Sequence, residues 1–343
     1  MFRGTYCFLF LISILVPSCS KQRTIHRSFY YWKSSLEISD SERLFLEQQN
    51  IEKLYVKFFD VVWNASANQA TPIAMIRFND LLPRQIEMVP AVYITDESLK
   101  KTAVENIPSL AENISELISK LSDHSGISFS EFQTDCDWTA TTKSKYFQLI
   151  ESLKKKFSEK KILFSATIRL HQIKYAEQTG IPPVDRGMLM FYNMGDLIDP
   201  STVNSIFDSS VAAKYVSRIK DYPLPLDVAL AVFTWGVHLR KGRVINLDDN
   251  LKMSEVNTSR LFMHLHENTY ATSQSFFFHG DYFIEGDLLR MEEISPAICE
   301  EAAKMVAPRI QNDYLSLAFF HFDESNLSRY SSQDFNRICN AFH

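Results

Sequence analysis

The sequence predicts an α/β fold, namely a (β/α)8 TIM barrel with a β-rich insertion between its seventh and eighth strands. Eight predicted strands, seven of them short and rich in Val, Ile, Leu or Phe, alternate with segments whose apolar residues recur every three or four positions. This alternation is typical of parallel strands joined by helices, and eight units in roughly 310 residues match the size of a barrel. An open doubly wound sheet is the alternative, but the chain has nine glycines and no glycine-rich phosphate-binding turn after its first strand.

Each predicted strand is rich in β-branched, aromatic or other apolar residues. The fourth begins as a regular alternation and ends in two carboxylates and a tryptophan, which makes it the most unusual of the eight. The predicted strands are Ser28–Trp32, Ile51–Val62, Val89–Thr95, Phe129–Thr139, Lys161–Ile168, Gly187–Asn193, Leu226–Trp235 and Leu315–Phe322.

The predicted helices are identified by their starts and by their apolar faces. Ser39 precedes acidic residues of a first turn, and Pro296 stands at the start of a later helix, as helix N-termini prefer. The predicted helices are Asp40–Gln49, Val104–Leu121, Lys143–Phe157, Ser201–Ile219, Ser295–Val306 and Ser331–Phe342.

The strand–helix alternation breaks between residues 242 and 293. This segment is longer than a simple crossover, and Gly280-Asp281 and Gly286-Asp287 within it are typical of tight turns between strands. We therefore expect a β-rich insertion on the rim of a single barrel domain that spans residues 28–343.

The first residues have the pattern of a signal peptide. Arg3 precedes an apolar run from Tyr6 to Val16 that is too short to span a bilayer. Val16-Pro17-Ser18-Cys19 resembles a bacterial lipobox, which implies removal of residues 1–18, lipidation of Cys19 and a tether over residues 19–27. By analogy with bacterial sorting, Ser20 suggests a lipid-anchored protein of the cell envelope at the outer membrane. An ordinary secretory signal with an incidental cysteine is the alternative.

Composition argues against several classes of site. The net charge is −5 and there is no block of basic residues, so nucleic acid is not an expected partner. The wide spacing of Cys136, Cys299 and Cys339 fits neither a disulfide framework nor a zinc site, although one pair stays possible. The histidines of the insertion lack metal-ligand spacing, and we expect no metal and no cofactor.

Carboxylates gather where predicted strands end, which is where barrels carry their sites. Asp135 and Asp137 alternate along the fourth strand, so we expect them on one face, close enough to raise the pKa of one of them. Asp60 ends the second strand, and Glu324 follows the eighth. Structural alternatives are a rim in which Lys57 or Arg169 pairs with these acids, and helix capping by Asp323 or Ser325 beside Glu324.

Aromatic residues occupy the same strand ends. All four tryptophans of the chain fall there, whereas core packing alone would scatter them. Aromatic rings stack on the apolar faces of sugars, and paired carboxylates are what glycoside hydrolysis requires, so the pattern predicts a carbohydrate cleft. The predicted ligand-binding residues are Trp32, Trp63, Trp138, Arg169, Tyr192, Asn193 and Trp235.

Two of these strand ends resemble motifs of glycoside hydrolase family 18, the chitinase-like barrels. Asp135-Cys136-Asp137-Trp138 resembles the fourth-strand motif DGxDxDxE, and Met190-Phe191-Tyr192-Asn193 resembles the sixth-strand motif MxYD. Val232–Gly236 is a weaker match to the seventh strand. The resemblance implies an oligosaccharide ligand and a role for Asp137 in orienting its acetamido group.

The sequence departs from that family where the chemistry is carried out. Thr139 stands at the position of the catalytic glutamate, Phe132-Gln133 replaces the first Asp-Gly, and Asn193 replaces the MxYD aspartate. Threonine cannot protonate a leaving oxygen, so the family's substrate-assisted mechanism is not expected.

Three hypotheses follow for the function. In the first, a glycoside hydrolase uses Asp135 or Asp137 as base, nucleophile or stabiliser and Glu324 or Asp60 as acid. In the second, a non-catalytic lipoprotein binds sugar. In the third, the barrel is a scaffold and the insertion contacts a protein partner.

Overall fold

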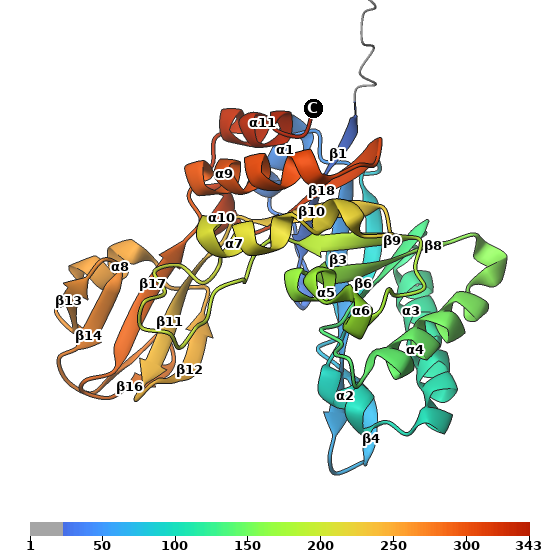
Figure 1. The fold of residues 1–343 in the computed structure, drawn as a ribbon, viewed down its shortest axis with the longest axis horizontal. Helices are drawn as coiled ribbons and strands as arrows, with labels where there is room; N and C mark the ends of the chain where they lie inside the picture. The colour runs from blue at the N-terminus through green and yellow to red at the C-terminus, as the bar shows by residue number, and fades with distance from the viewer. Residues whose placement is uncertain (1–22) are drawn as a thin grey trace, which may run out of the picture.

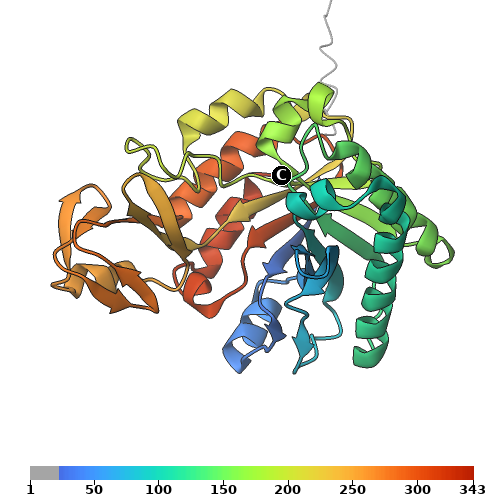
Figure 2. The ribbon, with the colours of Figure 1, turned by 90° about the horizontal axis from the view of Figure 1, so that it is seen from below.

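The computed structural model describes residues 23–343 and confirms the predicted fold class. Eight parallel strands form a closed sheet, because β1 pairs with β3 on one side and with β18 on the other. Helices surround this sheet, and the insertion stands to one side of it (Figures 1 and 2). The barrel strands are, in order around the ring, β1 (Thr24–Tyr31), β3 (Lys53–Asn64), β6 (Glu87–Ile94), β7 (Glu131–Asp135), β8 (Leu163–Arg169), β9 (Arg186–Met190), β10 (Leu226–Ala231) and β18 (Tyr314–Phe320).

The helices bury one apolar face against the barrel and begin where the sequence offers a cap. Ser39 and Glu42 form a capping box at the first helix, and Ser295 caps the helix that begins with Pro296. The helices around the barrel are α1 (Asp40–Gln48), α2 (Asp96–Lys101), α3 (Ile107–Ser125), α4 (Lys143–Lys156), α5 (Leu170–Lys174), α6 (Ala176–Thr179), α7 (Ser209–Val216), α9 (Pro296–Val306), α10 (Glu324–Leu327) and α11 (Ser332–Asn340).

Several predicted boundaries were wrong. The helix expected over residues 201–219 is the shorter α7, because Asp208 caps it and the preceding residues form a loop. Strand β7 ends at Asp135, so the loop that follows holds Asp137 and Trp138. Strand β1 begins at Thr24, inside the expected tether. The predicted signal peptide and Cys19 lie outside the described residues.

The insertion is a five-stranded antiparallel sheet with its own core. Its first strand begins at Thr234, so the expected start near residue 242 and the expected extension of β10 to Trp235 were both too late. Its core residues are Leu251, Val256, Phe262, Tyr270, Phe283, Leu289 and Met291. The sheet order is β12 (Arg243–Asp248), β11 (Thr234–Arg240), β17 (Leu288–Glu293), β14 (Thr269–Thr272) and β13 (Phe262–His266), with α8 (Met253–Thr258) and the hairpin of β15 (Phe276–Phe278) and β16 (Asp281–Phe283).

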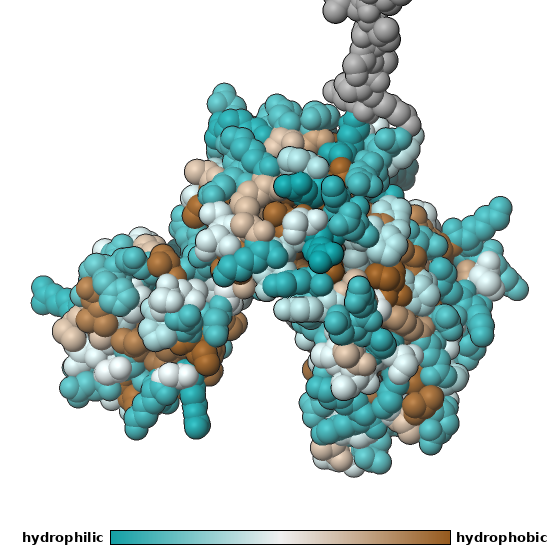
Figure 3. All heavy atoms as spheres, viewed as in Figure 1, coloured by the Kyte–Doolittle hydropathy of each residue, from teal (hydrophilic) through white to brown (hydrophobic). Residues whose placement is uncertain are grey.

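A second extension lies across the barrel from the insertion. Strand β3 continues beyond its barrel neighbours and pairs with β4 (Gln69–Ile73) in an antiparallel hairpin. A short parallel pair joins β2 (Ser35–Leu36), which precedes α1 in the chain, to β5 (Arg77–Phe78), which follows this hairpin. Figure 3 shows the surface deeply hollowed between the insertion and the lobe that holds β4 and α2. The carboxyl ends of the barrel strands therefore open into a broad cleft.

A buried carboxylate fastens the insertion to the barrel. Glu292 accepts hydrogen bonds from the backbone and hydroxyl of Ser205, at 2.8 and 2.6 Å, and from the indole of Trp235 at 2.8 Å. It also pairs with Arg290 at 2.6 Å, and Arg290 in turn donates to the carbonyl of Leu197. Both charged residues are almost fully buried, so their pairing fixes the loop between β9 and α7 on the sheet of the insertion.

We expect Glu292→Ala to lower the free energy of unfolding by about 3–5 kcal/mol, because it leaves the Arg290 guanidinium buried and unpaired. Urea denaturation followed by circular dichroism measures the change. Glu285→Ala, an exposed glutamate of the same insertion, is the matched control and should change stability by less than about 0.5 kcal/mol. A loss below about 1 kcal/mol for Glu292→Ala would contradict this view of the ion pair.

Candidate functional site

The polar floor of the barrel mouth is a row of three side chains on adjacent strands. In the sheet register, Asp60 of β3 lies opposite Tyr93 of β6, which lies opposite Asp135 of β7. Neighbouring strands are about 4.8 Å apart, so the backbones of the two aspartates are separated by about 10 Å. Burial, together with the charges of Asp135 and Asp137, raises the pKa of Tyr93 to about 12.

Asp135 is the buried acid of this row. Its carboxylate accepts a hydrogen bond from the hydroxyl of Thr167 at 2.6 Å and lies 3.7 Å from the guanidinium of Arg169. Burial raises the pKa of Asp135, and Asp137 adds to this effect, although Arg169 opposes it. The predicted increase in pKa for one of the two aspartates thus has burial as its main cause.

Asp137 lies beyond the end of β7 and is much more exposed. Nε of Arg169 donates to its carboxylate at 2.5 Å, while 47% of the Asp137 side chain remains accessible to solvent. Arg169 therefore bridges the buried and the exposed aspartate. Although burial lowers the pKa of Arg169, the two carboxylates raise it overall, so the guanidinium remains charged between them.

Asp60 pairs with a cation of its own strand. Nζ of Lys57 lies 3.1 Å from one carboxylate oxygen of Asp60 and 5.9 Å from the ring centre of Trp32. The other carboxylate oxygen is buried and makes no hydrogen bond within residues 23–343. Among Asp60, Tyr93 and Asp135, it is the buried side-chain oxygen that lacks a partner in the part of the chain that the structure describes.

Five aromatic rings line the mouth on the side of the insertion. Trp32 packs on Phe320 at 5.9 Å between ring centres, and Phe320 stacks on Tyr192 at 5.5 Å. Phe233 packs against Phe320 at 5.8 Å and against Trp235 at 5.2 Å. Trp32, Phe320 and Trp235 are partly exposed, whereas Tyr192 and Phe233 are buried behind them. The rings form a continuous row from β1 across β18 to the first strand of the insertion.

Two predicted tryptophans lie outside this row. Trp138 is completely buried, stacks on Tyr146 at 4.9 Å and donates its indole N–H to the carbonyl of Thr179. It belongs to the core, so the expectation that it contacts sugar was wrong. Trp63 stands three residues after Asp60 on β3, and alternation along the strand places it on the opposite face, outside the mouth.

The acids after β18 are held at the rim. Asp323 caps α10 by accepting from the backbone of Ser325 and pairs with Lys33 at 2.7 Å, and its pKa is lowered to about 2 against the effect of burial. Glu324 accepts from the hydroxyl of Ser41 at 3.0 Å. Because β18 lies opposite β7 in the ring, the structure does not bring Glu324 to the Asp135–Asp137 pair.

Thr139 gives no acid to the site. Its hydroxyl lies within hydrogen-bond distance of the hydroxyls of Thr141 and Thr142, in the turn that leads into α4.

A pocket of about 350 Å³ lies next to Asp137. It is lined by Asp137, Arg169, Leu170, His171, Tyr192, Asn193, Met194 and Tyr215.

Phe233, Phe320 and Tyr93 are site residues that the sequence reasoning missed. Phe320 is the last residue of β18, and Tyr93 is the residue before the last of β6. Their positions at strand ends were the available signal, but 26 phenylalanines and 14 tyrosines in the chain gave no reason to single them out.

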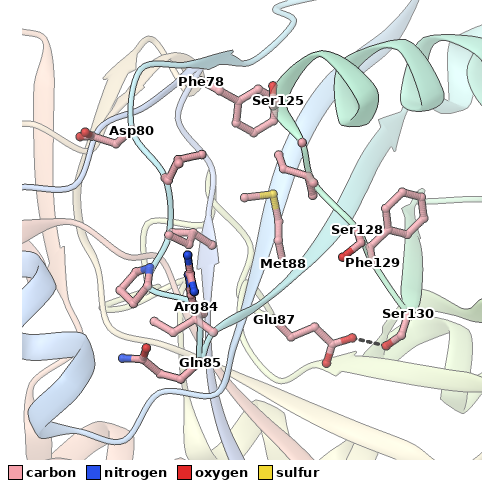
Figure 4. Close-up of a pocket in the computed structure, with 16 residues that line it drawn as sticks. Phe78, Asp80, Arg84, Gln85, Glu87, Met88, Ser125, Ser128, Phe129 and Ser130 are labelled. Carbon is pink, nitrogen blue, oxygen red and sulfur yellow. Dashed lines mark hydrogen bonds between the residues drawn. The ribbon is translucent and has the colours of Figure 1, made fainter.

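A larger cavity of about 630 Å³ lies at the other end of the barrel (Figure 4). It is formed by the loops before β6 and β7, and Glu87 and Ser130 form a hydrogen bond across its edge. This end of the barrel is opposite the carboxyl ends of the strands, and none of the predicted site residues lines the cavity.

The cysteines, the metal-ligating residue types and the helices of the described chain bear on three further expectations. Cys136, Cys299 and Cys339 are buried free thiols, so the possible pair does not form. Residues 23–343 contain no group of three or more His, Cys, Asp or Glu placed to hold a metal. Within the same range, every helix is too short or too polar to cross a bilayer.

Comparison with solved structures relates this fold to chitinase-like barrels. No protein-family model and no curated protein matches the sequence. The spore cortex-lytic enzyme SleL of Bacillus cereus is similar with a TM-score of 0.55 and 11% identity, over 94% of this chain and 75% of that enzyme. The class V chitinase of Nicotiana tobaccum matches with a TM-score of 0.54 and 13% identity, over 92% of this chain and 99% of the chitinase.

A chitinase-like agglutinin, RobpsCRA of Robinia pseudoacacia, has the same fold. Its TM-score is 0.52 and its identity 12%, over 92% of this chain and 99% of the agglutinin. A mutant of the tobacco chitinase has also been solved in complex with NAG4. At these identities the likeness shows the fold, and this fold is found in an agglutinin as well as in hydrolases.

The raised pKa of Asp135 predicts a pH-dependent stability difference. An aspartate in an unfolded chain ionises near pH 4, whereas buried Asp135 still holds its proton there. Above about pH 4 the wild type should therefore lose stability relative to Asp135→Asn, by up to about 1.4 kcal/mol per pH unit until Asp135 ionises.

Urea unfolding between pH 4 and pH 8 measures this difference. Asp123→Asn, at an exposed position in α3, should show no such trend. A difference between wild type and Asp135→Asn that is constant with pH would contradict the raised pKa.

Proposed function

We propose that the protein binds an oligosaccharide in the barrel mouth without hydrolysing it. The observation that carries the proposal is the row of aromatic rings from Trp32 through Phe320 to Trp235 beside the polar floor. Partly exposed rings offer apolar faces to sugar rings, and the floor supplies donors and acceptors for hydroxyl groups. The presence of a chitinase-like agglutinin among proteins of this fold supports binding as a function of such a barrel.

The arrangement of acids argues against turnover. Glycoside hydrolysis needs one carboxylic acid that protonates the leaving oxygen and a second carboxylate beside it. Asp137 accepts from Arg169, Asp60 pairs with Lys57, and Thr139 has no acidic group. Glu324 lies on the opposite side of the ring.

Hydrolysis is the second candidate, because one pair of acids is suitably placed. Asp135 has a raised pKa, as a general acid requires. Asp60 has a buried carboxylate oxygen without a partner in residues 23–343, and its backbone lies two strands, or about 10 Å, from that of Asp135. Asp135 is only 5% exposed, however, so a glycosidic oxygen would have to displace Thr167 to reach it. The glycan-binding experiment described below therefore also measures whether the protein hydrolyses the bound glycan.

We further propose that Cys19 is lipidated and tethers the barrel to a bacterial envelope membrane, with the mouth directed away from it. Arg23 donates to the carbonyls of Asn312, Phe342 and Ile310, which fixes it at the amino-terminal end of the barrel. Three residues lie between Cys19 and Arg23, so the four residue steps from one to the other span at most about 14 Å. This end would then lie next to the membrane, and the cleft would face outward.

Alanine substitution of the exposed tryptophans tests sugar binding. On an array of bacterial and chitin-derived glycans, we expect Trp32→Ala and Trp235→Ala each to weaken binding at least about tenfold, or about 1.4 kcal/mol, because a stacking face is lost. Phe277→Ala, which removes an exposed aromatic of the insertion, is the control. The proposal fails if the wild type binds no glycan, or if it releases reducing sugar from a bound glycan at any pH between 4 and 8.

The anchor is tested in cells with Cys19→Ser. The wild type should incorporate labelled palmitate and sediment with membranes, whereas the variant should do neither, since it lacks the acylated thiol. Cys339→Ser, a buried thiol of the barrel, should leave labelling unchanged. Labelling of the Cys19→Ser variant would contradict the anchor and leave the sugar-binding proposal untouched.

A further inference from the structure

We propose a second carbohydrate-binding site on the outside of the barrel, centred on Trp63 and separate from the mouth. It lies where the β3–β4 hairpin meets the α2–α3 connection, in a pocket of about 380 Å³. Its ligand would be a neutral oligosaccharide. The inference does not rest on sugar binding in the mouth, because the two sites share no residue.

The strand geometry separates this site from the mouth. Val61 and Trp63 share one face of β3, and the opposite face carries Asp60. The carbonyl of Val61 accepts from the hydroxyls of Thr95 and Ser98 at the start of α2, so the helix covers this part of the strand. Trp63 stands just beyond the covered part and remains partly exposed.

The wall of the pocket is rich in primary amides. Asn68, Gln69, Asn106 and Asn113 contribute four exposed carboxamides. They come from the hairpin, from a short 3-10 helix (Val104–Asn106) before α3, and from α3 itself. None of these side-chain amides forms a hydrogen bond with another residue of the described chain. The hydroxyl of Ser109 and the ammonium of Lys101 complete the polar lining.

This set of groups selects a class of ligand. Each carboxamide both donates and accepts, as a sugar hydroxyl does, so amides and hydroxyls satisfy one another in pairs. An anionic ligand would require more cations than Lys101 alone. A lipid or an apolar peptide would require a mostly apolar lining. A tryptophan surrounded by free amides and a hydroxyl therefore fits a neutral sugar best.

Lys101 can yield its present position to a ligand. Its ammonium lies 5.8 Å from the ring centre of Trp63 and 2.7 Å from Glu97, and both members of the Lys101–Glu97 pair are exposed. Exposed ion pairs contribute little stability, so the ammonium can move to donate to a sugar hydroxyl while a sugar ring takes its place over the indole.

The test uses the mature chain on an array of neutral oligosaccharides that includes N-acetylglucosamine oligomers, with affinities from titration calorimetry. A mouth variant, Trp32→Ala with Trp235→Ala, should keep its affinity for at least one of these glycans. Adding Trp63→Ala, or Asn106→Ala with Asn113→Ala, should then weaken that binding at least tenfold.

Asn340→Ala, an exposed asparagine of α11, is the control and should leave affinity unchanged. The asparagine pair is exposed and free of hydrogen bonds, so it decides the outcome even if loss of Trp63 disturbs folding. The proposal is overturned if the mouth variant binds no neutral glycan, or if the variant that also carries Asn106→Ala and Asn113→Ala retains full affinity. The proposal that the mouth binds sugar is contradicted separately, if the mouth variant binds every glycan with wild-type affinity.

Discussion

Closure of the sheet is the constraint on which the rest of this molecule depends. Each pairing around the ring is parallel, and β1 pairs with both β3 and β18. All eight strands therefore point in one direction around a common axis, and their carboxyl ends form a single ring. Asp60, Asp135, Arg169, Tyr192 and Phe320 are far apart in the sequence, and closure brings them to one end. The interior must then be filled, and polar side chains share that task with apolar ones: Tyr30 stacks on Tyr55 and donates to Gln133, and Lys53 pairs with Glu131.

Charge pairing determines what the mouth can recognise. Arg169 compensates Asp135 and Asp137, Lys57 compensates Asp60, and Lys33 compensates Asp323. A ligand that enters therefore meets hydrogen-bonding groups of both kinds without a large excess of either charge. Such a floor suits a neutral, hydroxyl-rich ligand. It suits acid catalysis less well, because Asp135, the acid whose pKa is raised by burial, is only 5% exposed.

The sequence predicted the barrel well and the site only in part, for a physical reason. Apolar runs identify strands because the strands of a closed parallel sheet are buried on both faces. Side-chain direction depends on the register of each strand and on where it ends, and a shift of one residue changes the face. Alternation placed Asp135 and Asp137 together on β7, but β7 ends at Asp135, and a loop carries Asp137 to Arg169.

The directions of the four tryptophan side chains also depend on strand register and on where each strand ends, which the sequence did not reveal. All four were predicted to line one cleft because all four stand at or near the ends of predicted strands. Trp32 and Trp235 do line the mouth, Trp138 is buried against Tyr146, and Trp63 faces outward toward α3. Composition identifies residues suited to stacking, whereas only the register of β3 and the end of β7 determine which of them a ligand can reach.

The buried Glu292 then links ligand recognition to the fold of the insertion. The same carboxylate oxygen accepts from the indole of Trp235 and from the backbone and hydroxyl of Ser205, and the other oxygen binds Arg290. It therefore holds the ring at the end of the aromatic row, the loop before α7 and the insertion sheet in one arrangement. A charge buried this deeply is costly unless every partner is present. The orientation of Trp235 is consequently as rigid as the attachment of the insertion itself, so the cleft is formed before any ligand arrives.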